Sequence, residues 1–280
     1  GEILAIYEGH GLVKLDRDSN VIWSWAEPAH HDLEVLDDGR IWVLARKARV
    51  VEDLNPRRAI LEDFAVLLGP DGKEQKRVSL LEAVRATAEP VMNHIPRMRG
   101  DIFHTNSLEV LDGRVPDPRF KAGNLLLSAR VPSVVFVVDP DLGKAVWWNH
   151  GEYRKQHDPS ILPDGHMLLF DNIGLGDGRS AVRELTVPMM EEVWSYRASE
   201  ENPFFSRFCG AAQRLPNGNT LISESGVGRV LEVDPAGKVV WRFDNPARAG
   251  ENQEFVAIVP ELVRLPASVM DGWTPSAGTP

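Results

Sequence analysis

Residues 30–39 read HHDLEVLDDG, and the pattern of this stretch recurs along the chain. Each copy has a short apolar strand, a turn that contains Asp-Gly or Asn-Gly, and then a second apolar strand. The other copies read HTNSLEVLDG, HDPSILPDG and GAAQRLPNG, and they begin at His104, His157 and Gly210. A repeat explains the apolar positions and the turns, because every copy must solve the same packing problem. It does not explain the histidines, which packing does not require at these positions.

Two further apolar runs complete the repeated unit. The third runs are residues 11–16, 133–139, 181–185 and 228–234. The fourth runs each contain tryptophan, and they are residues 21–25, 145–148, 192–196 and 239–243. Four short strands about every 45 residues, joined by glycine-containing turns, are typical of propeller blades. We therefore predict an all-β fold, a β-propeller of four-stranded antiparallel blades in which the tryptophans pack between blades.

The chain shows about five blade repeats, and its two ends leave the number of blades open. The strand at residues 3–7 has no inner strand before it, and residues 255–266 have no partner strands after them. The two ends either close one blade together, which gives five, or are remnants of a six-bladed ring with a truncated N-terminal blade. We expect one propeller domain over residues 1–268, with an insertion at about 50–100 and a flexible tail over 269–280. The insertion should contain an outer strand pair, at about 64–78, and a helix over 80–88.

Composition narrows the classes of partner. The formal net charge of -10 argues against nucleic acid as the main partner. No apolar run approaches the ~20 residues that span a bilayer, so we expect no membrane span in this chain. The N-terminus carries no signal sequence. The single cysteine, Cys209, excludes a disulfide within the chain.

The histidines should gather at one end of the propeller. In a blade, the strand that follows the long loop is innermost and lines the central channel, so residues at its start surround the channel mouth. The blades that begin at His31, His104 and His157 are consecutive, so these side chains can converge. The copy at Gly210 presents no polar group there. The repeat therefore predicts a functional site on three neighbouring blades.

Five motifs in this order resemble the bacterial arylsulfotransferase (aryl-sulfate sulfotransferase) family, from about residue 10 to 245. They are HHD before the first turn, HTNS at 104–107, LSAR at 127–130, QHD at 156–158 and FDN at 170–172. The resemblance implies a six-bladed propeller and a sulfotransferase that is independent of the nucleotide sulfate donor PAPS. Such an enzyme moves a sulfuryl group from an aryl sulfate ester to a phenolic acceptor through a sulfohistidine. It also implies a periplasmic or cell-envelope location and no cofactor.

The same resemblance implies roles for individual residues. His157 matches the histidine that becomes sulfated. His104 and Arg130 match the residues that hold the sulfuryl oxygens, and His31 matches the remaining catalytic histidine. His30 stays an alternative to His31, although His31 shares its repeat position with His157.

Four residues are expected to bind substrate or support the site, namely Asn106, His30, Asp171 and Asn172. These residue types suit the chemistry, because a neutral imidazole is a competent nucleophile and an arginine offers a rigid donor fork to sulfonate oxygens. Two other readings remain open. One is a non-catalytic propeller that acts as a binding or assembly module. The other is a metal-dependent hydrolase or lyase, in which the three histidines and Asp32 or Asp158 hold a metal ion.

Overall fold

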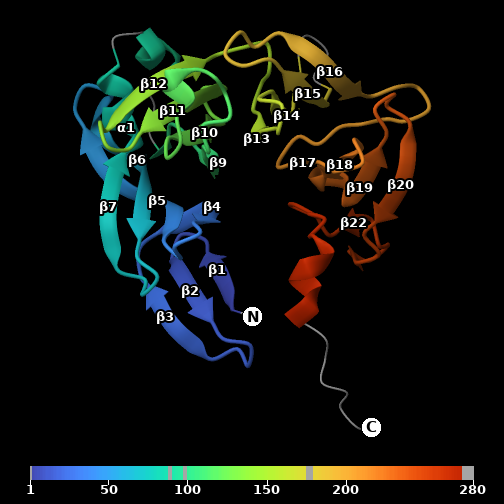
Figure 1. The fold of residues 1–280 in the computed structure, drawn as a ribbon, viewed down its shortest axis with the longest axis horizontal. Coiled ribbons are helices and arrows are strands. Elements are labelled where there is room, and N and C mark those ends of the chain that lie inside the picture. The colour runs from blue at the N-terminus through green and yellow to red at the C-terminus, as the bar shows by residue number, and fades with distance from the viewer. Residues whose placement is uncertain (1, 88–89, 97–99, 175–178, 273–280) are drawn as a thin grey trace.

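The computed structural model describes residues 2–87, 90–96, 100–174 and 179–272, and it is a five-bladed β-propeller (Figure 1). The first blade contains β1 (Ile3–Tyr7), β2 (Gly11–Leu15) and β3 (Val21–Trp25). The second contains β4 (Ala29–Val35), β5 (Ile41–Val51), β6 (Asn55–Leu68) and β7 (Glu74–Ser79), with β8 (Gly100–Asp101) beside β6. The third contains β9 (Thr105–Val110), β10 (Leu125–Ala129), β11 (Val134–Asp139) and β12 (Lys144–Asn149). The fourth contains β13 (His157–Ile161), β14 (Met167–Asp171), β15 (Ala181–Leu185) and β16 (Glu192–Arg197). The fifth contains β17 (Ala211–Arg214), β18 (Thr220–Glu224), β19 (Arg229–Val233) and β20 (Val239–Asp244).

The predicted all-β fold is confirmed, and four of the blades have four antiparallel strands in chain order. The first blade has three strands, and β1 pairs with β2 alone among the described residues. The two ends of the chain therefore do not close one blade together, and the ring is open between them in Figure 1. After β20, the short strands β21 (Arg248–Ala249) and β22 (Phe255–Val256) pair with each other.

The segment that was expected to be an insertion supplies the outer half of the second blade. Strands β6 and β7 are the predicted outer pair, and β6 begins earlier than predicted because β5 and β6 form one long hairpin. Helix α1 (Leu80–Arg85) follows directly, and Ser79 caps it by accepting a hydrogen bond from the backbone of Glu82 at 3.0 Å. Of the expected tail, Ala267–Gly272 form a short 3-10 helix, and residues 273–280 lie outside the described residues. No helix among the described residues is long and apolar enough to cross a membrane.

Tryptophans join neighbouring blades at the rim, as the sequence predicts. The indole N–H of Trp23, in the first blade, donates to the carbonyl of Pro70 in the second at 3.0 Å. In the same way Trp194, in the fourth blade, donates to the carbonyl of Pro235 in the fifth at 2.9 Å. Both tryptophans are half-buried, and each of these bonds ties the last strand of one blade to a turn of the next.

Polar side chains join the blades at the centre. Asp32 on β4 accepts from the backbone N–H of Leu108 on β9 at 2.7 Å, and Glu109 on β9 accepts from that of Ile161 on β13 at 2.8 Å. Asp158 on β13 accepts from the N–H of Ala212 on β17 at 3.0 Å. Each inner strand thus offers an acceptor to the next, so these acidic residues of the repeat hold the ring together.

The C-terminal segment continues this pattern beyond the fifth blade. The side-chain oxygen of Gln213 accepts from the backbone N–H of Arg264 at 2.7 Å, and its nitrogen donates to the Arg264 carbonyl at 3.2 Å. Arg264 also pairs with Glu232 at 2.7 Å, as Arg214 pairs with Glu184 at 2.7 Å one blade earlier. Residues 262–264 therefore occupy the place of a following inner strand.

Replacement of Gln213 by alanine should release this segment. Loss of the paired amide removes two hydrogen bonds, each worth about 1 kcal/mol. Hydrogen exchange of the amides in residues 260–266 should therefore accelerate by roughly tenfold or more. Gln253→Ala, at an exposed position, is the control, and equal exchange in both variants would contradict the role given to Gln213.

Candidate functional site

The sequence-predicted histidines lie at the start of the inner strands, where the backbone is bent. His31, His104, Asp158 and Cys209 all have positive φ, between 50° and 54°. The pairing of β4 with β5 and of β13 with β14 shifts register at these points, which is the mark of a β-bulge. A bulge turns a side chain out of the regular alternation, and strained non-glycine backbone gathers at functional sites. A non-glycine residue with positive φ therefore stands at or just before the start of the inner strand in four neighbouring blades.

These residues surround a cavity of about 170 Å³. His31, Asn106, His157 and Cys209 line it, together with Asp32, Ser107, Asp158, Gly210, Ala211, Pro260 and Glu261. His104 lies beside it, with its ring centroid 4.7 Å from that of His31. Three of the four predicted catalytic residues thus meet at one end of the channel.

The fifth blade has no side chain at the repeat position of His157. Gly210 takes that place, and a Cβ atom there would lie 2.6 Å from the ring of Phe170. Its φ of 137° is also a conformation that other residues rarely adopt. The glycine therefore reflects a packing constraint, whereas the neighbouring Cys209 reaches the cavity.

His157 is held in a single tautomer. Its Nδ1 lies 2.6 Å from the side-chain oxygen of Asn172. The amide nitrogen of Asn172 donates to the carbonyls of Ser206 at 2.9 Å and Cys209 at 2.6 Å, so its oxygen must face the imidazole. His157 Nδ1 is therefore the donor, and Nε2 keeps its lone pair.

Burial keeps His157 uncharged. The side chain is 8 % exposed, and burial lowers its pKa to about 4, although the hydrogen bond that it donates to Asn172 raises this pKa. The charge of Arg130 and the neighbouring His104 and His31 lower this pKa further. A neutral imidazole with a free Nε2 is a nucleophile at neutral pH.

His104 has a different partner. Its Nδ1 lies 2.7 Å from Oδ2 of Asp101, and its backbone N–H donates to the other carboxylate oxygen at 2.6 Å. Burial raises the pKa of Asp101, but these hydrogen bonds and the charge of His104 bring it below its usual value. Asp101 is thus an ionised acceptor that fixes the orientation of the His104 ring. No motif in the sequence points to Asp101, although it stands three residues before His104.

Arg130 brings positive charge to this end of the channel. It follows β10, its backbone N–H donates to the His104 carbonyl at 3.2 Å, and its guanidinium lies 5.9 Å from the ring centroid of Phe208. No carboxylate forms an ion pair with it among the described residues, whereas its charge acts on His157, Lys155 and Cys209. A half-buried arginine without a counter-ion is suited to bind an anion.

The four expected binding residues divide into two groups. Asn106 lines the cavity, and its amide nitrogen donates to the Gln156 carbonyl at 2.9 Å, while its buried oxygen has no hydrogen-bond partner in the part of the chain that the structure describes. His30, Asp171 and Asn172 do not line the cavity. His30 lies behind His31, with the two Nδ1 atoms 2.9 Å apart.

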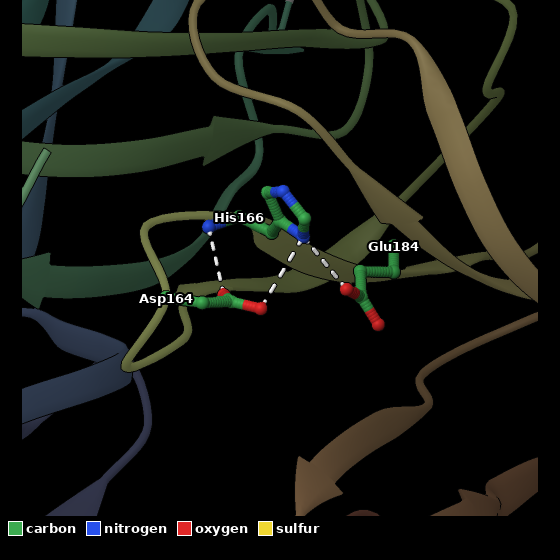
Figure 2. A group of neighbouring side chains, drawn as sticks. All are labelled: Asp164, His166 and Glu184. Atoms are coloured by element: carbon green, nitrogen blue, oxygen red, sulfur yellow. Dashed lines mark hydrogen bonds and ion pairs between the residues drawn. The ribbon is translucent and has the colours of Figure 1, made fainter. Parts of the chain in front are cut away.

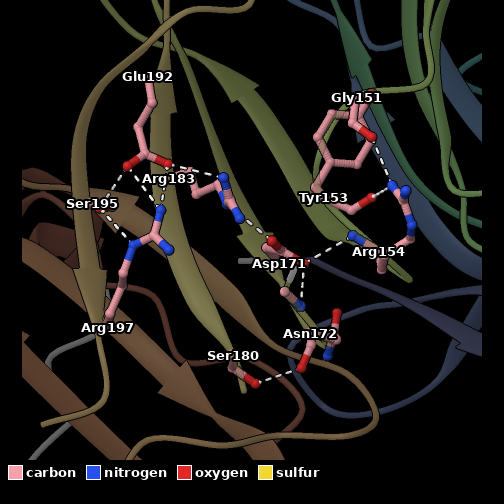
Figure 3. Close-up of polar contacts among 11 residues, drawn as sticks. Gly151, Tyr153, Arg154, Asp171, Asn172, Ser180, Arg183, Glu192, Ser195 and Arg197 are labelled. Atoms are coloured by element: carbon pink, nitrogen blue, oxygen red, sulfur yellow. Dashed lines mark hydrogen bonds and ion pairs between the residues drawn. The ribbon is translucent and has the colours of Figure 1, made fainter. Parts of the chain in front are cut away.

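Asp171 belongs to a network next to the site (Figure 3). Its oxygens accept from the backbone N–H of Arg154 and of Gly174, each at 2.9 Å, and from Arg183 at 2.9 Å. Arg183 also pairs with Glu192 at 3.0 Å. A second cavity, of about 210 Å³, lies beside this network, and Arg183 and Arg197 line it. Both arginines already have acidic partners. Asp171 therefore anchors the end of β14, from which Asn172 reaches His157.

A possible metal site lies elsewhere (Figure 2). In the described part of the chain, ligand atoms of Asp164, His166 and Glu184 lie within 4.8 Å of one another, and the three cavity histidines do not form such a group. His166 Nδ1 is 2.8 Å from Glu184, whose other oxygen binds Arg214 at 2.7 Å. Asp38 and Asp112 pair with an arginine at the matching positions of two other turns. His166 therefore pairs with the turn aspartate as an arginine does in the two other turns. Among the described residues, the hypothesis of a metal ion held by the histidines at the channel mouth gains no support.

The geometry defines a class of protein, a β-propeller with histidines and an arginine gathered at one end of its channel. The chain belongs to the arylsulfotransferase (ASST) family, whose model matches residues 4–246. The resemblance seen in the sequence is thereby confirmed. No curated protein sequence matches the chain.

Solved structures confirm the propeller fold. The β-propeller domain of Cps50 (Swd1) from Myceliophteria thermophila matches with a TM-score of 0.56 and 11% identity, over 88% of this chain and 70% of that one. A streptogramin B lyase matches with a TM-score of 0.52 and 10% identity, over 88% and 66%. Virginiamycin B lyase from Staphylococcus aureus matches with a TM-score of 0.51 and 10% identity, over 88% and 67%. At such low identity these likenesses concern the fold alone.

Proposed function

We propose that this protein moves a sulfuryl group from an aryl sulfate ester to a phenolic acceptor through a sulfohistidine at His157, without a nucleotide donor or a metal. The observation that carries the proposal is the state of His157. It is neutral, its Nδ1–H is fixed by Asn172, and its Nε2 lone pair is free beside the cavity. Membership of the arylsulfotransferase family supports the substrate class.

In the first step, His157 Nε2 attacks sulfur and the bond from sulfur to the phenolic oxygen breaks. The electron pair of that bond leaves on the phenolate. In-line transfer of this kind is accelerated mainly by positioning and by charge that stabilises the equatorial oxygens. In this proposal Arg130 supplies that charge, since it lacks an ion-pair partner among the described residues, and His104, whose ring contacts Asp101, donates a hydrogen bond to a sulfuryl oxygen.

In the second step, the acceptor phenol loses its proton and its oxygen attacks the sulfur. The N–S bond breaks, and its electron pair returns to His157 Nε2. His31 is the base and acid of both steps, since it lines the same cavity and burial keeps its pKa at about 4, so its ring is neutral near pH 7. Its Nε2 gives a proton to the leaving phenolate while its Nδ1 takes one up from the side away from the cavity, and the reverse exchange removes the proton of the acceptor. Such acid–base help is worth roughly 10²–10⁴-fold in rate.

The direct test uses 4-nitrophenyl sulfate as donor and phenol as acceptor. We expect release of coloured nitrophenol that depends on the acceptor, parallel lines in the double-reciprocal plots of a ping-pong mechanism, and phenyl sulfate as product. Absence of both nitrophenol and phenyl sulfate at high protein concentration would contradict the proposal.

The pH dependence of the first half-reaction follows from the pKa of His157. Its folded pKa of about 4 lies below the ordinary histidine value, so the nucleophile is lost only when the pH falls through about 4. The burst of nitrophenol in a single turnover should therefore keep its rate down to about pH 5. A fall in the burst rate centred at pH ~6.5 would contradict this prediction, because it would show that a histidine with the ordinary pKa controls the step.

A further inference from the structure

Two buried ionisable residues behind the site have no part in the chemistry described so far. His30 and Asp63 are each 1 % exposed, and Asp63 follows Glu62 within residues 59–68 of β6, which are otherwise apolar. Buried ionisable groups are rare unless they are paired, and an unpaired buried nitrogen costs about 1–3 kcal/mol. Their presence here calls for a reason.

The two residues form a continuous chain of contacts with His31. His31 Nδ1 is 2.9 Å from His30 Nδ1, and His30 Nε2 is 3.7 Å from Asp63 Oδ1. His30 Nε2 has no hydrogen-bond partner among the described residues. The other oxygen of Asp63 accepts from the backbone N–H of Thr105 at 2.9 Å, which points Oδ1 toward His30. The 3.7 Å gap exceeds a hydrogen bond, so proton transfer requires these two side chains to approach.

Two arrangements of protons give each of these contacts one donor and one acceptor while both rings stay neutral. Burial lowers the pKa of His30 to about 3, so like His31 it carries one N–H. In the first arrangement, Asp63 is ionised, His30 carries its proton on Nε2, and His31 carries its proton on Nδ1. In the second, Asp63 is protonated, His30 carries its proton on Nδ1, and His31 carries its proton on Nε2. The second arrangement contains one proton more than the first.

We infer that Asp63 and His30 form a buried proton relay that stores, on Asp63, the proton which His31 exchanges with the phenolic oxygens. When His31 Nε2 takes the proton of the acceptor, the Nδ1 proton of His31 passes to His30 Nδ1 and the Nε2 proton of His30 passes to Asp63. The reverse sequence protonates the leaving phenolate. The relay rests on the proposed function, and Asp63 and His30 are positioning residues because they act through His31.

The charges around the relay fit this cycle. Burial raises the pKa of Asp63 to about 7, with Asp101 raising it further and with Thr105 and His104 opposing. Arg46 lowers and Asp101 raises the pKa values of His30 and His31. The Ala45 backbone raises that of His30, while His104 lowers and Glu8 raises that of His31. Asp63 is therefore the member of the relay that changes its charge near neutral pH, and no imidazolium has to remain in the cavity.

The test follows the tautomer of His31 by nitrogen NMR of protein labelled with ¹⁵N-histidine, without substrate. In the unmodified protein, the His31 proton should move from Nε2 to Nδ1 as the pH rises from about 5 to about 9, with a midpoint near the Asp63 pKa of about 7. In Asp63→Asn the tautomer should not change with pH, because the amide cannot take up a proton. In Asp53→Asn, an exposed residue of the same blade, it should change as in the unmodified protein.

Each outcome decides the question. A tautomer that is independent of pH in the unmodified protein overturns the relay, even if Asp63→Asn fails to fold. A tautomer that still changes in Asp63→Asn overturns the role of Asp63. Replacement of His30 by asparagine provides a second interruption and should also fix the tautomer.

Activity gives a second, separable readout. Asp63→Asn should lower kcat for transfer to weakly acidic phenols by about 10–100-fold, with little change in KM for the donor. The nitrophenol burst should change by less than about threefold, because that leaving group needs no proton. If no variant and not even the unmodified protein transfers sulfuryl, the proposed function fails, while the NMR measurement still decides the relay.

Discussion

Replacement of His157 by asparagine should abolish sulfuryl transfer, with a loss in kcat of at least about 10³-fold. The reason is specific to its position. His157 is the buried imidazole whose Nδ1 is fixed by Asn172, and its Nε2 is therefore the lone pair presented to the substrate. An asparagine side chain offers no comparable nucleophile. The measurement is nitrophenol release and phenyl sulfate formation at saturating donor.

The matched control is His10→Asn. His10 is exposed and stacks on Tyr7 outside the cavity, so its loss should leave turnover within about twofold. The His157 variant should still bind the donor, because Arg130 and His104 remain. A His157 variant with near-normal turnover would remove the covalent mechanism.

Replacement of Arg130 by alanine should lower kcat by about 10²–10³-fold, the usual effect of removing a group that stabilises transition-state charge. The Arg130 guanidinium has no ion-pair partner among the described residues, so its full charge is available to the sulfuryl oxygens. The same charge lowers the pKa of His157. Removal of this charge should raise the pKa of His157, because protonation of the ring is then less strongly opposed. The acid limb of the nitrophenol burst should therefore move to higher pH.

Two further variants separate charge from geometry. Arg130→Lys keeps the positive charge but loses the planar donor fork. Compared with Arg130→Ala, it should bring the acid limb of the burst back close to its original pH but recover less of the lost kcat. Arg207→Ala removes the second guanidinium on Phe208, which lies 5.6 Å from that ring centroid, and tests whether loss of packing alone explains the effect. Equal losses in Arg207→Ala and Arg130→Ala would contradict a direct role for Arg130.

The repeat allowed much of the fold to be predicted. Every run predicted as the third strand of a unit, and every fourth run with its tryptophan, coincides with a strand of the structure, because alternation and turn chemistry are local properties of the sequence. The same repeat predicted that the histidines gather at one end of the channel. It did not predict that β5 and β6 form one long hairpin, and it left open whether the two ends of the chain close one blade together, because both depend on the packing of whole blades.

The supporting residues were harder to predict. Asn172 stands in one of the motifs, but its contact with His157 depends on the carbonyls of Ser206 and Cys209, far along the chain. Asp101 and Asp63 lie outside the histidine repeat, and only the fold brings Asp63 next to His30. One signal for Asp63 was present, namely a pair of carboxylates, Glu62-Asp63, inside an apolar strand.

The supporting residues share one arrangement, which explains how the site works as a unit. Each of the three histidines has Nδ1 in contact with a group behind it, an amide for His157, a carboxylate for His104 and an imidazole for His31. The ε nitrogens are therefore left for the substrate. The partners differ in what they do for the ring, because the Asn172 amide fixes the tautomer of His157, the Asp101 carboxylate accepts from the His104 ring, and an imidazole allows a proton to pass.

The most direct test of the central claim is to trap the covalent intermediate. The protein is mixed with 4-nitrophenyl sulfate in the absence of acceptor, quenched under alkaline conditions, and its intact mass and peptides are measured. We predict a mass gain of one sulfuryl group, located on His157, that disappears when phenol is added before the quench. Transfer to phenol without any adduct, or an adduct on a residue other than His157, would contradict the account.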